Sequence, residues 1–286
     1  MKYLERVLVL LALMLVGVLL VGGGIKYSSK SLADHLGSST VALVISVPDE
    51  DPSSRDSEVR AYCTGVWVDS HHILTANHCV DMVLEHMQKV QDAKEELWKS
   101  SPPCLGVELM FGMCQPHDLV DHYEIDVHEI NINYVVYHEV SKIGEEPSSV
   151  HLSHVLNVDS GHDLALLEVV GSIIPEHTYV KIAERDPLVL TPLVLVGHPK
   201  GYYWTFLNGS VSSYRMERGI DGTEESPYMQ VQGPGATNGN SGGGAFNMSG
   251  ELVGLADFGI NSLPSELFYI DADNLRYFVY NTLAKK

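Results

Sequence analysis

Basic residues are scarce in this sequence. The 286 residues include 18 lysines and arginines against 37 aspartates and glutamates, which gives a formal net charge of −19 at pH 7. This balance disfavours nucleic acids and anionic membrane surfaces as partners. Acidity also keeps a soluble domain dispersed, and we favour that explanation over a substrate groove selected for its acidity.

Recognisable metal-binding motifs are missing as well. The chain contains no His-Glu-x-x-His, and His151-x-x-His154 alone is a weak pattern. Cys104 and Cys114 have histidines downstream, but the spacing matches no Cys/His zinc motif. We therefore expect chemistry that uses no metal and no other cofactor.

Charged and strongly polar side chains are absent from residues 7–25. An apolar run of this length can cross a bilayer as a helix, so we predict a transmembrane signal anchor over 7–25 that contacts the lipid bilayer. A short cytoplasmic tail over 1–6 precedes it, and a tether over 26–38 leads to a folded domain over 39–286. A cleaved signal peptide is the alternative, since Val21-Gly22-Gly23-Gly24-Ile25 is a weak version of a cleavage site.

The cysteines indicate the compartment. Between Cys63 and Cys79 the residues alternate and turn like a hairpin, which would bring the two cysteines face to face as a disulfide. A second disulfide between Cys104 and Cys114 would close a short segment. Disulfides belong to oxidising compartments, so we expect the folded domain outside the cytoplasm, in a periplasmic, extracellular or lumenal space.

One glycine-rich run, Gly239-Asn240-Ser241-Gly242-Gly243-Gly244-Ala245, carries a serine in its middle. Glycines on both sides let the backbone turn tightly and aim N–H groups into one small space. Ser241 is therefore a candidate nucleophile, and the N–H groups of Gly239 and Ser241 are candidates for an oxyanion hole. A flexible Gly/Ser turn between strands is the competing interpretation.

A nucleophilic serine needs a base and a group that orients the base. His78 in Thr75-Ala76-Asn77-His78-Cys79 is the candidate base, and Asp163, at the start of an apolar strand, is the candidate orienter. Asp126 and Asp159 are alternatives to Asp163. Two other histidines, His71 and His72, are expected to be structural.

These motifs resemble those of trypsin-like serine peptidases, and their details are most similar to the HtrA/Deg branch. The order His78, Asp163, Ser241 matches the family, as do Asp163-Leu-Ala-Leu-Leu and Gly239-Asn-Ser-Gly-Gly. The resemblance covers roughly residues 38–280 and implies a Ser-His-Asp triad with an acyl-enzyme on Ser241. It also implies a cleft between two barrels, with His78 and Asp163 on one and Ser241 on the other.

Short alternating segments with regular turn signals predict an all-β fold with two barrels. The resemblance implies that these are two six-stranded antiparallel β-barrels of trypsin-like type. We place the first barrel at about 39–170 and the second at about 180–270. Strands are expected at the positions listed next: 41–47, 59–68, 72–76, 124–130, 133–137, 163–167, 180–182, 188–197, 202–213, 228–232 and 251–255. An insertion over 81–115 departs from the compact family form, with a helix predicted over 81–99 that is either a packed excursion or a lid beside the cleft.

The resemblance also implies a substrate pocket, with its floor at Gly235, Ala236, Thr237 and Asn238 and one wall at Asp257, Phe258 and Gly259. Gly235 stands where trypsin-type enzymes carry an aspartate, so small or medium apolar residues are the expected preference. Digestive members usually carry serine at the position of Asp257. This carboxylate would clash with Asp163, bind a substrate amide or face solvent, and the sequence does not choose among these.

The sequence therefore predicts a membrane-anchored serine endopeptidase acting on protein or peptide substrates. Asn240 stands where zymogen-type relatives carry aspartate, so activation by N-terminal cleavage is not expected. The sequence shows no PDZ domain of the kind found in HtrA relatives. Two alternatives remain open: a catalytically silent binding module on the same fold, and a secreted peptidase whose N-terminal segment is cleaved.

Overall fold

The computed structural model describes residues 29–48, 58–100, 126–136, 150–171, 178–218, 225–233, 238–260 and 262–285. The anchor predicted over 7–25 and the Cys104–Cys114 disulfide lie outside these residues. Among the described helices, none is long and apolar enough to cross a membrane.

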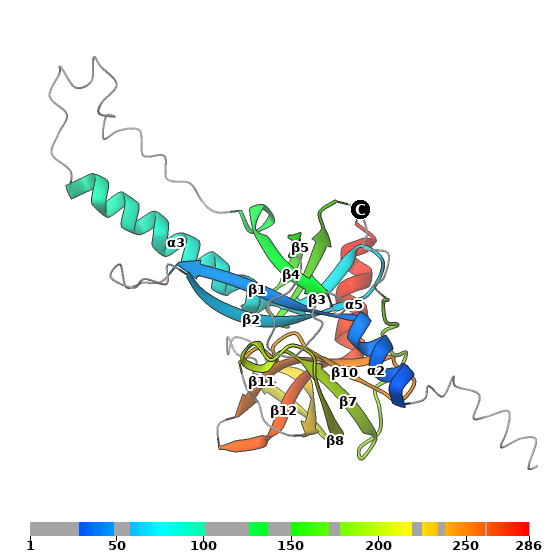
Figure 1. Ribbon diagram of the computed structural model, residues 1–286. Coiled ribbons are helices and arrows are strands. Elements are labelled where there is room, and N and C mark those ends of the chain that lie inside the picture. The colour runs from blue at the N-terminus through cyan, green and yellow to red at the C-terminus, as the bar shows by residue number, and fades with distance from the viewer. Residues whose placement is uncertain are drawn as a thin grey trace, which may run out of the picture.

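The first half of the chain forms a closed barrel with the strand order β1-β2-β3-β6-β5-β4, and every pair is antiparallel. The second half repeats the design in the order β10-β11-β12-β9-β8-β7. The two barrels lie one above the other in Figure 1. This confirms the predicted pair of six-stranded antiparallel barrels.

The strands of the first barrel are β1 (Thr40–Pro48), β2 (Glu58–Trp67), β3 (His72–Ala76), β4 (Asn131–Val136), β5 (His151–Asp159) and β6 (Leu164–Val169). Those of the second barrel are β7 (Pro192–Gly197), β8 (Thr205–Arg218), β9 (Glu225–Gln232), β10 (Gly244–Phe246), β11 (Leu252–Ile260) and β12 (Leu263–Asp271). The helices are α2 (Ser29–Ser38), α3 (Asn77–Ser100) and α5 (Ala272–Leu283), with 3-10 turns η2 (Val127–Glu129) and η4 (Pro199–Gly201).

Strand β3 is buried at all five positions because both of its faces are covered. Successive side chains of a strand point to opposite faces. Ile73 joins a core of first-barrel residues, whereas Leu74, on the opposite face of the strand, joins a core that also holds second-barrel residues such as Phe246 and Leu255. A shared hydrophobic core therefore fixes the two barrels against each other.

Two helices add to this shared core. Leu32 and Leu36 of α2 and Leu275 and Phe278 of α5 pack into it. In Figure 1 α5 lies beside both barrels, and Asn157 of β5 donates a hydrogen bond of 2.8 Å to Thr282 at the end of α5. The described part of the segment predicted as a tether is thus helical from Ser29 onward, and it packs on the barrels through Leu32 and Leu36.

Helix α3 begins at Asn77, four residues before the predicted start, and projects away from the first barrel (Figure 1). Its first turns are held down by Val80, which is fully buried, and by Val83 and Leu84, which pack on the barrel core. Farther along, Met87 is 38% exposed. Because the helix starts earlier than predicted, His78 lies in its first turn.

Three further local expectations need correction. In the described part of the predicted 124–130 strand, the carboxylate of Asp126 accepts from the N–H of His128 and caps the turn η2. The predicted strand over 180–182 contributes only an isolated bridge between Ile182 and Leu252. Helix α5 was not predicted, although Asp271 gives it a side-chain N-cap by accepting from the N–H of Asn274.

The predicted disulfide joins Cys63 on β2 to Cys79 on α3, with a Cα–Cα distance of 6.3 Å. Both side chains are buried. Because Cys79 follows His78 directly, this bond ties the first turn of α3 to the barrel wall.

We predict that the double substitution Cys63→Ala/Cys79→Ala lowers the free energy of unfolding by about 3 kcal/mol, since the cross-link closes a loop of roughly 15 residues in the unfolded chain. Urea unfolding at matched pH would measure the change. Reduced wild-type protein is the control and should fall by a similar amount. Equal midpoints for the oxidised wild type and the double variant would contradict the prediction.

Candidate active site

His78 and Asp163 form a closely hydrogen-bonded pair. The backbone N–H of His78 donates to Oδ1 of Asp163 at 2.7 Å, and His78 Nδ1 lies 2.7 Å from Oδ2. Burial alone would lower the pKa of His78, but the hydrogen bond and negative charge of Asp163, helped by nearby Asp257 and Asp81, raise it above 6.5. The ring therefore carries its proton on Nδ1 and leaves Nε2 as the basic atom.

Asp163 reaches His78 from a strained backbone position. It directly precedes β6 and has a φ of 53°, which is uncommon for a residue other than glycine. Its carbonyl oxygen accepts from the N–H of Asn77 at 3.0 Å. Asp163 is therefore hydrogen-bonded to the start of α3 through both its main chain and its side chain. Such strain persists only where the surrounding structure enforces it.

The alternative orienters have other partners. Asp159 lies 3.0 Å from Nδ1 of His162, and Asp126 caps η2. His72 is buried and paired with Asp69 at 2.7 Å, which fits its expected structural role. Among the three carboxylates considered from sequence, Asp163 is the one hydrogen-bonded to His78.

Ser241 lies in a turn that two glycines with positive φ create, Gly239 at 99° and Gly242 at 77°. Its carbonyl oxygen accepts from the N–H of Thr64 on β2 at 2.8 Å, which brings the turn of the second barrel onto the first. A Cβ on Gly242 would lie 2.1 Å from the Thr64 carbonyl oxygen, so only glycine fits this close approach.

No hydrogen bond links the Ser241 hydroxyl to His78 or to any other described residue. Hydrogen bonds between a nucleophile and its base are often long in unliganded peptidases and tighten when substrate binds. Within the described part of the chain, no hydrogen bond is found from the N–H groups of Gly239 and Ser241, the two groups predicted to form an oxyanion hole.

A buried hydrogen-bond network that sequence reasoning missed holds Gly239 in place. Thr64 Oγ1 donates to the Gly239 carbonyl oxygen at 2.8 Å and accepts from the N–H of His198 at 3.1 Å. Burial lowers the pKa of His198 to about 3, so this ring is neutral and its Nδ1 accepts from the N–H of Trp204 at 2.8 Å. No sequence motif marks Thr64 for this task.

Asp257 is the unexpected member of the site. Its side chain is buried, and Oδ2 accepts from the hydroxyl of Tyr228 at 2.6 Å, so the solvent-facing alternative is wrong. One ring nitrogen of His78 and carboxylate oxygens of Asp163 and Asp257 lie within 4.8 Å of one another. Burial, followed by the charge of Asp163, raises the pKa of Asp257 to about 8.

The other predicted pocket residues are described in part. The segment 235–237 lies outside the described residues, and Asn238 is exposed, with its carbonyl oxygen accepting from the N–H of Lys200. The ring of Phe258 stacks on Phe268 at 4.6 Å and meets Tyr228 edge-on. The structure therefore brings Asp257 to the His78–Asp163 pair, whereas Phe258 packs against aromatic side chains of the second barrel.

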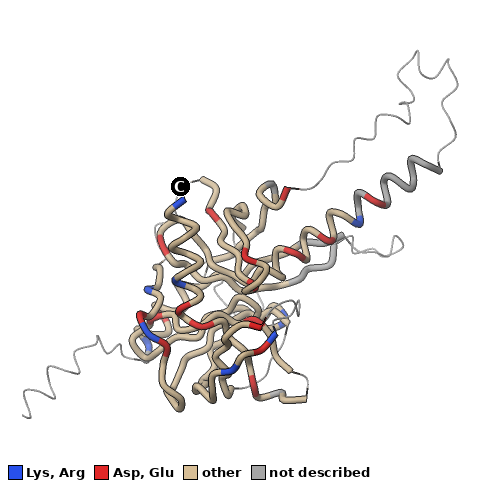
Figure 2. The backbone as a smooth tube through the Cα atoms, turned by 180° about the vertical axis from the view of Figure 1, so that it is seen from behind, with Lys and Arg blue, Asp and Glu red and all other residues tan. Residues whose placement is uncertain are grey.

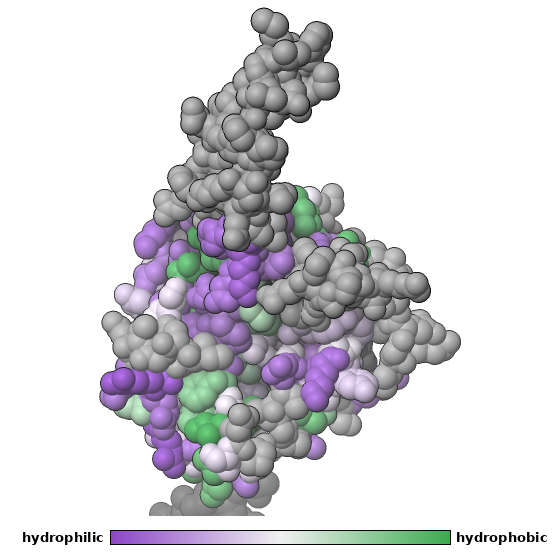
Figure 3. Space-filling model, turned by 90° about the vertical axis from the view of Figure 1, so that its left-hand side faces the viewer, coloured by the Kyte–Doolittle hydropathy of each residue, from purple (hydrophilic) through white to green (hydrophobic). Residues whose placement is uncertain are grey.

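Acidic residues are spread over the described chain, where red positions outnumber blue ones on both barrels and on α3 (Figure 2). The face in Figure 3 is mostly hydrophilic in its described part, with small hydrophobic areas between the purple residues. The charged positions are thus distributed over the described elements.

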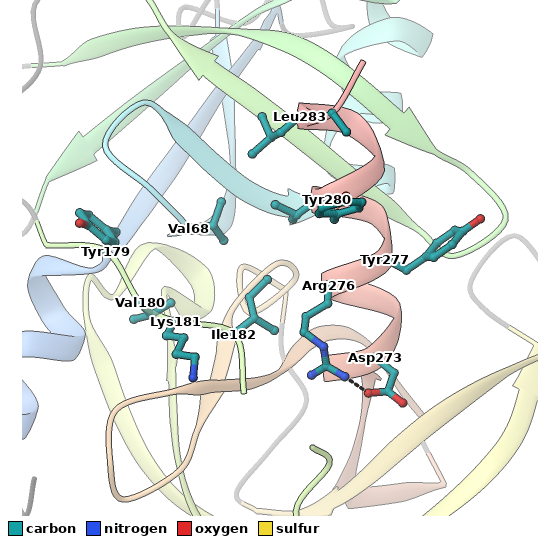
Figure 4. A pocket seen from close by; sticks show the side chains of 12 residues that line it. Val68, Tyr179, Val180, Lys181, Ile182, Asp273, Arg276, Tyr277, Tyr280 and Leu283 are labelled. Atoms are coloured by element: carbon teal, nitrogen blue, oxygen red, sulfur yellow. Dashed lines mark hydrogen bonds and ion pairs between the residues drawn. The ribbon is translucent and has the colours of Figure 1, made fainter. Parts of the chain in front are cut away.

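A cavity of about 1100 Å³ opens beside α5 (Figure 4). An ion pair between Arg276 and Asp273 lies at its edge. Its lining residues are Val68, Tyr179, Val180, Lys181, Ile182, Asp273, Arg276, Tyr277, Val279, Tyr280, Leu283 and Ala284. This lining shares no residue with the predicted site.

Two closed antiparallel barrels, with a His–Asp pair on one and a glycine-flanked serine turn from the other packed against it, define the class of trypsin-like serine peptidase folds. Residues 63–255 match the model of the trypsin-like peptidase domain family. The chain belongs to this family.

Individual relatives agree with the family assignment. The chain is 32% identical over 106 residues to a probable periplasmic serine endoprotease, DegP-like, of Marinomonas sp., covering 37% of this chain and 21% of that one. A protein described in the same words from Rhizobium meliloti is 37% identical over 98 residues, or 34% of this chain and 18% of its own length. The chain thus spans about a fifth of the length of these curated relatives.

A solved structure supports the fold. The crystal structure of the Rv3671c protease from M. tuberculosis in its active form superposes with a TM-score of 0.56 at 15% identity. The superposition covers 89% of this chain and 83% of that one.

We predict that Thr64→Val destabilises the protein by about 1–3 kcal/mol. It removes the hydroxyl partner of the buried Gly239 carbonyl oxygen and of the His198 N–H, which keep only a long bond of 3.4 Å to each other. Thr64→Ser keeps the hydroxyl and is the matched control, with a smaller loss from one buried methyl group. Urea unfolding of the three proteins would measure the difference. Equal stability of the valine and serine variants would contradict the assigned hydrogen bonds.

Proposed function

We propose that the chain is a serine endopeptidase in which Ser241, His78 and Asp163 act as the catalytic triad. The observation that carries the proposal is the pair of 2.7 Å hydrogen bonds from His78 to Asp163. They favour a proton on Nδ1 and leave Nε2 of a partly buried imidazole as the base. Family membership over residues 63–255 supports the same assignment.

In this proposal the Ser241 hydroxyl attacks the carbonyl carbon of the scissile peptide bond while His78 takes its proton. The N–H groups of Gly239 and Ser241 stabilise the oxyanion. His78 then returns the proton to the leaving amine, an acyl-enzyme remains on Ser241, and water releases it by the reverse sequence. Asp163 holds the tautomer and stabilises the imidazolium.

We propose small or medium apolar residues before the scissile bond. Gly235 carries no carboxylate to pair with arginine or lysine. Asp257 is 4% exposed and already engaged by Tyr228, so it is not free to take a basic substrate side chain either.

We further propose that the peptidase domain lies outside the cytoplasm and that residues 7–25 anchor it in a membrane. The uncharged run over 7–25 and the Cys63–Cys79 disulfide support this arrangement. The relatives named as periplasmic endoproteases fit the same side of the membrane.

The triad predicts covalent labelling of the purified, oxidised domain by a fluorophosphonate probe, because only an activated serine reacts quickly. Ser241→Ala and His78→Ala should abolish labelling. Asp163→Asn should slow it by about 10³-fold or more, since the amide favours the wrong tautomer. Labelling that survives Ser241→Ala would locate the reactive group elsewhere, and a folded wild type that does not label would favour a silent binding module.

The anchor predicts that the full chain sediments with membranes and stays there after carbonate washing, whereas a chain that starts at residue 26 is released. N-terminal sequencing of the membrane-bound protein provides a second measurement. A mature start beyond Ile25 would contradict the anchor and indicate a secreted peptidase.

A further inference from the structure

Two buried carboxyl groups from different barrels meet beside His78. Asp163 precedes β6 of the first barrel and is 5% exposed, and Asp257 on β11 of the second is 4% exposed. Their oxygens lie within 4.8 Å of each other and of a His78 ring nitrogen. Two carboxylates this close in a buried site cannot both be ionised at low cost, so the pair holds one proton at neutral pH.

The hydrogen bonds determine which carboxyl group holds the proton. Asp163 accepts two short bonds from His78, one from the backbone N–H and one from Nδ1, and both stabilise its ionised form. Asp257 accepts from the Tyr228 hydroxyl alone, and its Oδ1 is buried with no hydrogen-bond partner among the described residues. A proton on Oδ1 of Asp257 satisfies this oxygen and gives Asp163 a third donor.

We propose that Asp257 is a positioning residue for the triad, a neutral carboxylic acid that donates a hydrogen bond to the Asp163 carboxylate and is itself held by Tyr228. The inference rests on the proposed function of the triad. The proposal specifies the protonation state of Asp257, which can be measured without any peptidase activity.

The groups that act on Asp257 come from three elements: Asp163 before β6, His78 on α3 and Tyr228 on β9. Burial and Asp163 raise the pKa of Asp257 to about 8, whereas Tyr228 and His78 lower it. Loss of the proton would remove the donor to Asp163 and set two like charges against each other. It would also hold His78 in its protonated form at higher pH, because added negative charge raises the pKa of His78.

A neutral Asp257 predicts that activity falls on the alkaline side of the pH profile, which we call the upper limb. For the wild type, kcat/KM should rise as His78 loses its proton and then fall above a pH of about 8 as Asp257 ionises. In Asp257→Asn an amide donates to Asp163, accepts from Tyr228 and cannot ionise, so the fall near pH 8 should vanish. Identical upper limbs in the two proteins would overturn the proposal.

Two further variants separate positioning from packing. Asp257→Leu fills the space without a donor and should lower kcat/KM at pH 7 by roughly 10- to 100-fold more than Asp257→Asn does, the loss of one hydrogen bond to a charged group. Tyr228→Phe removes a bond that lowers the pKa of Asp257, so its upper limb should move to higher pH. A leucine variant as active as the asparagine variant would overturn the proposal.

A spectroscopic measurement decides the matter even for an inactive or poorly folding variant. Carboxyl ¹³C signals of wild-type aspartates, assigned by comparison with Asp257→Asn, should include one that titrates near pH 8 and is missing from the variant. A titration of Asp257 near its ordinary pKa of about 3.9 would overturn the proposal. Absence of fluorophosphonate labelling with this titration intact would count against the proposed catalysis and leave the acid pair standing.

Discussion

The site depends on hydrogen bonds that cross from one barrel to the other at Thr64. Its backbone N–H binds the carbonyl oxygen of Ser241, and its hydroxyl binds that of Gly239. Gly239 and Ser241 in the serine turn are thereby both fixed to β2. The same strand contains Cys63, whose disulfide to Cys79 also fixes the start of α3. Ser241 and His78, the proposed nucleophile and base, come from different barrels but are both fixed to the same strand.

Charge is the second constraint on this region. A buried aspartate is tolerated at Asp163 because His78 satisfies both of its oxygens, and at Asp257 because Tyr228 and a bound proton do so. The strained backbone at Asp163 and the close approach at Gly242 are the conformational cost of this arrangement. These features lower the stability of the protein but hold the groups around the His78 ring in a fixed geometry.

The sequence predicted what is encoded locally. Alternation located most strands, and the glycine run marked the turn that needs positive φ at Gly239 and Gly242. It did not predict contacts that depend on register between distant strands: Tyr228 and Asp257 are 29 positions apart and meet because β9 and β11 both pair with β12. Thr64 and His198 were missed for the same reason, since neither residue type in its local pattern indicates a partner in the other barrel.

Helix α5 has a consequence for the order of events during synthesis. It follows the twelve described strands along the chain, yet its Leu275 and Phe278 belong to the core shared by both barrels, and Thr282 contacts β5. Domains generally fold from the N-terminal end as the chain emerges. Each barrel can therefore close before its orientation to the other is final, and the core that the two barrels share is completed only when α5, the last described element, has been synthesised.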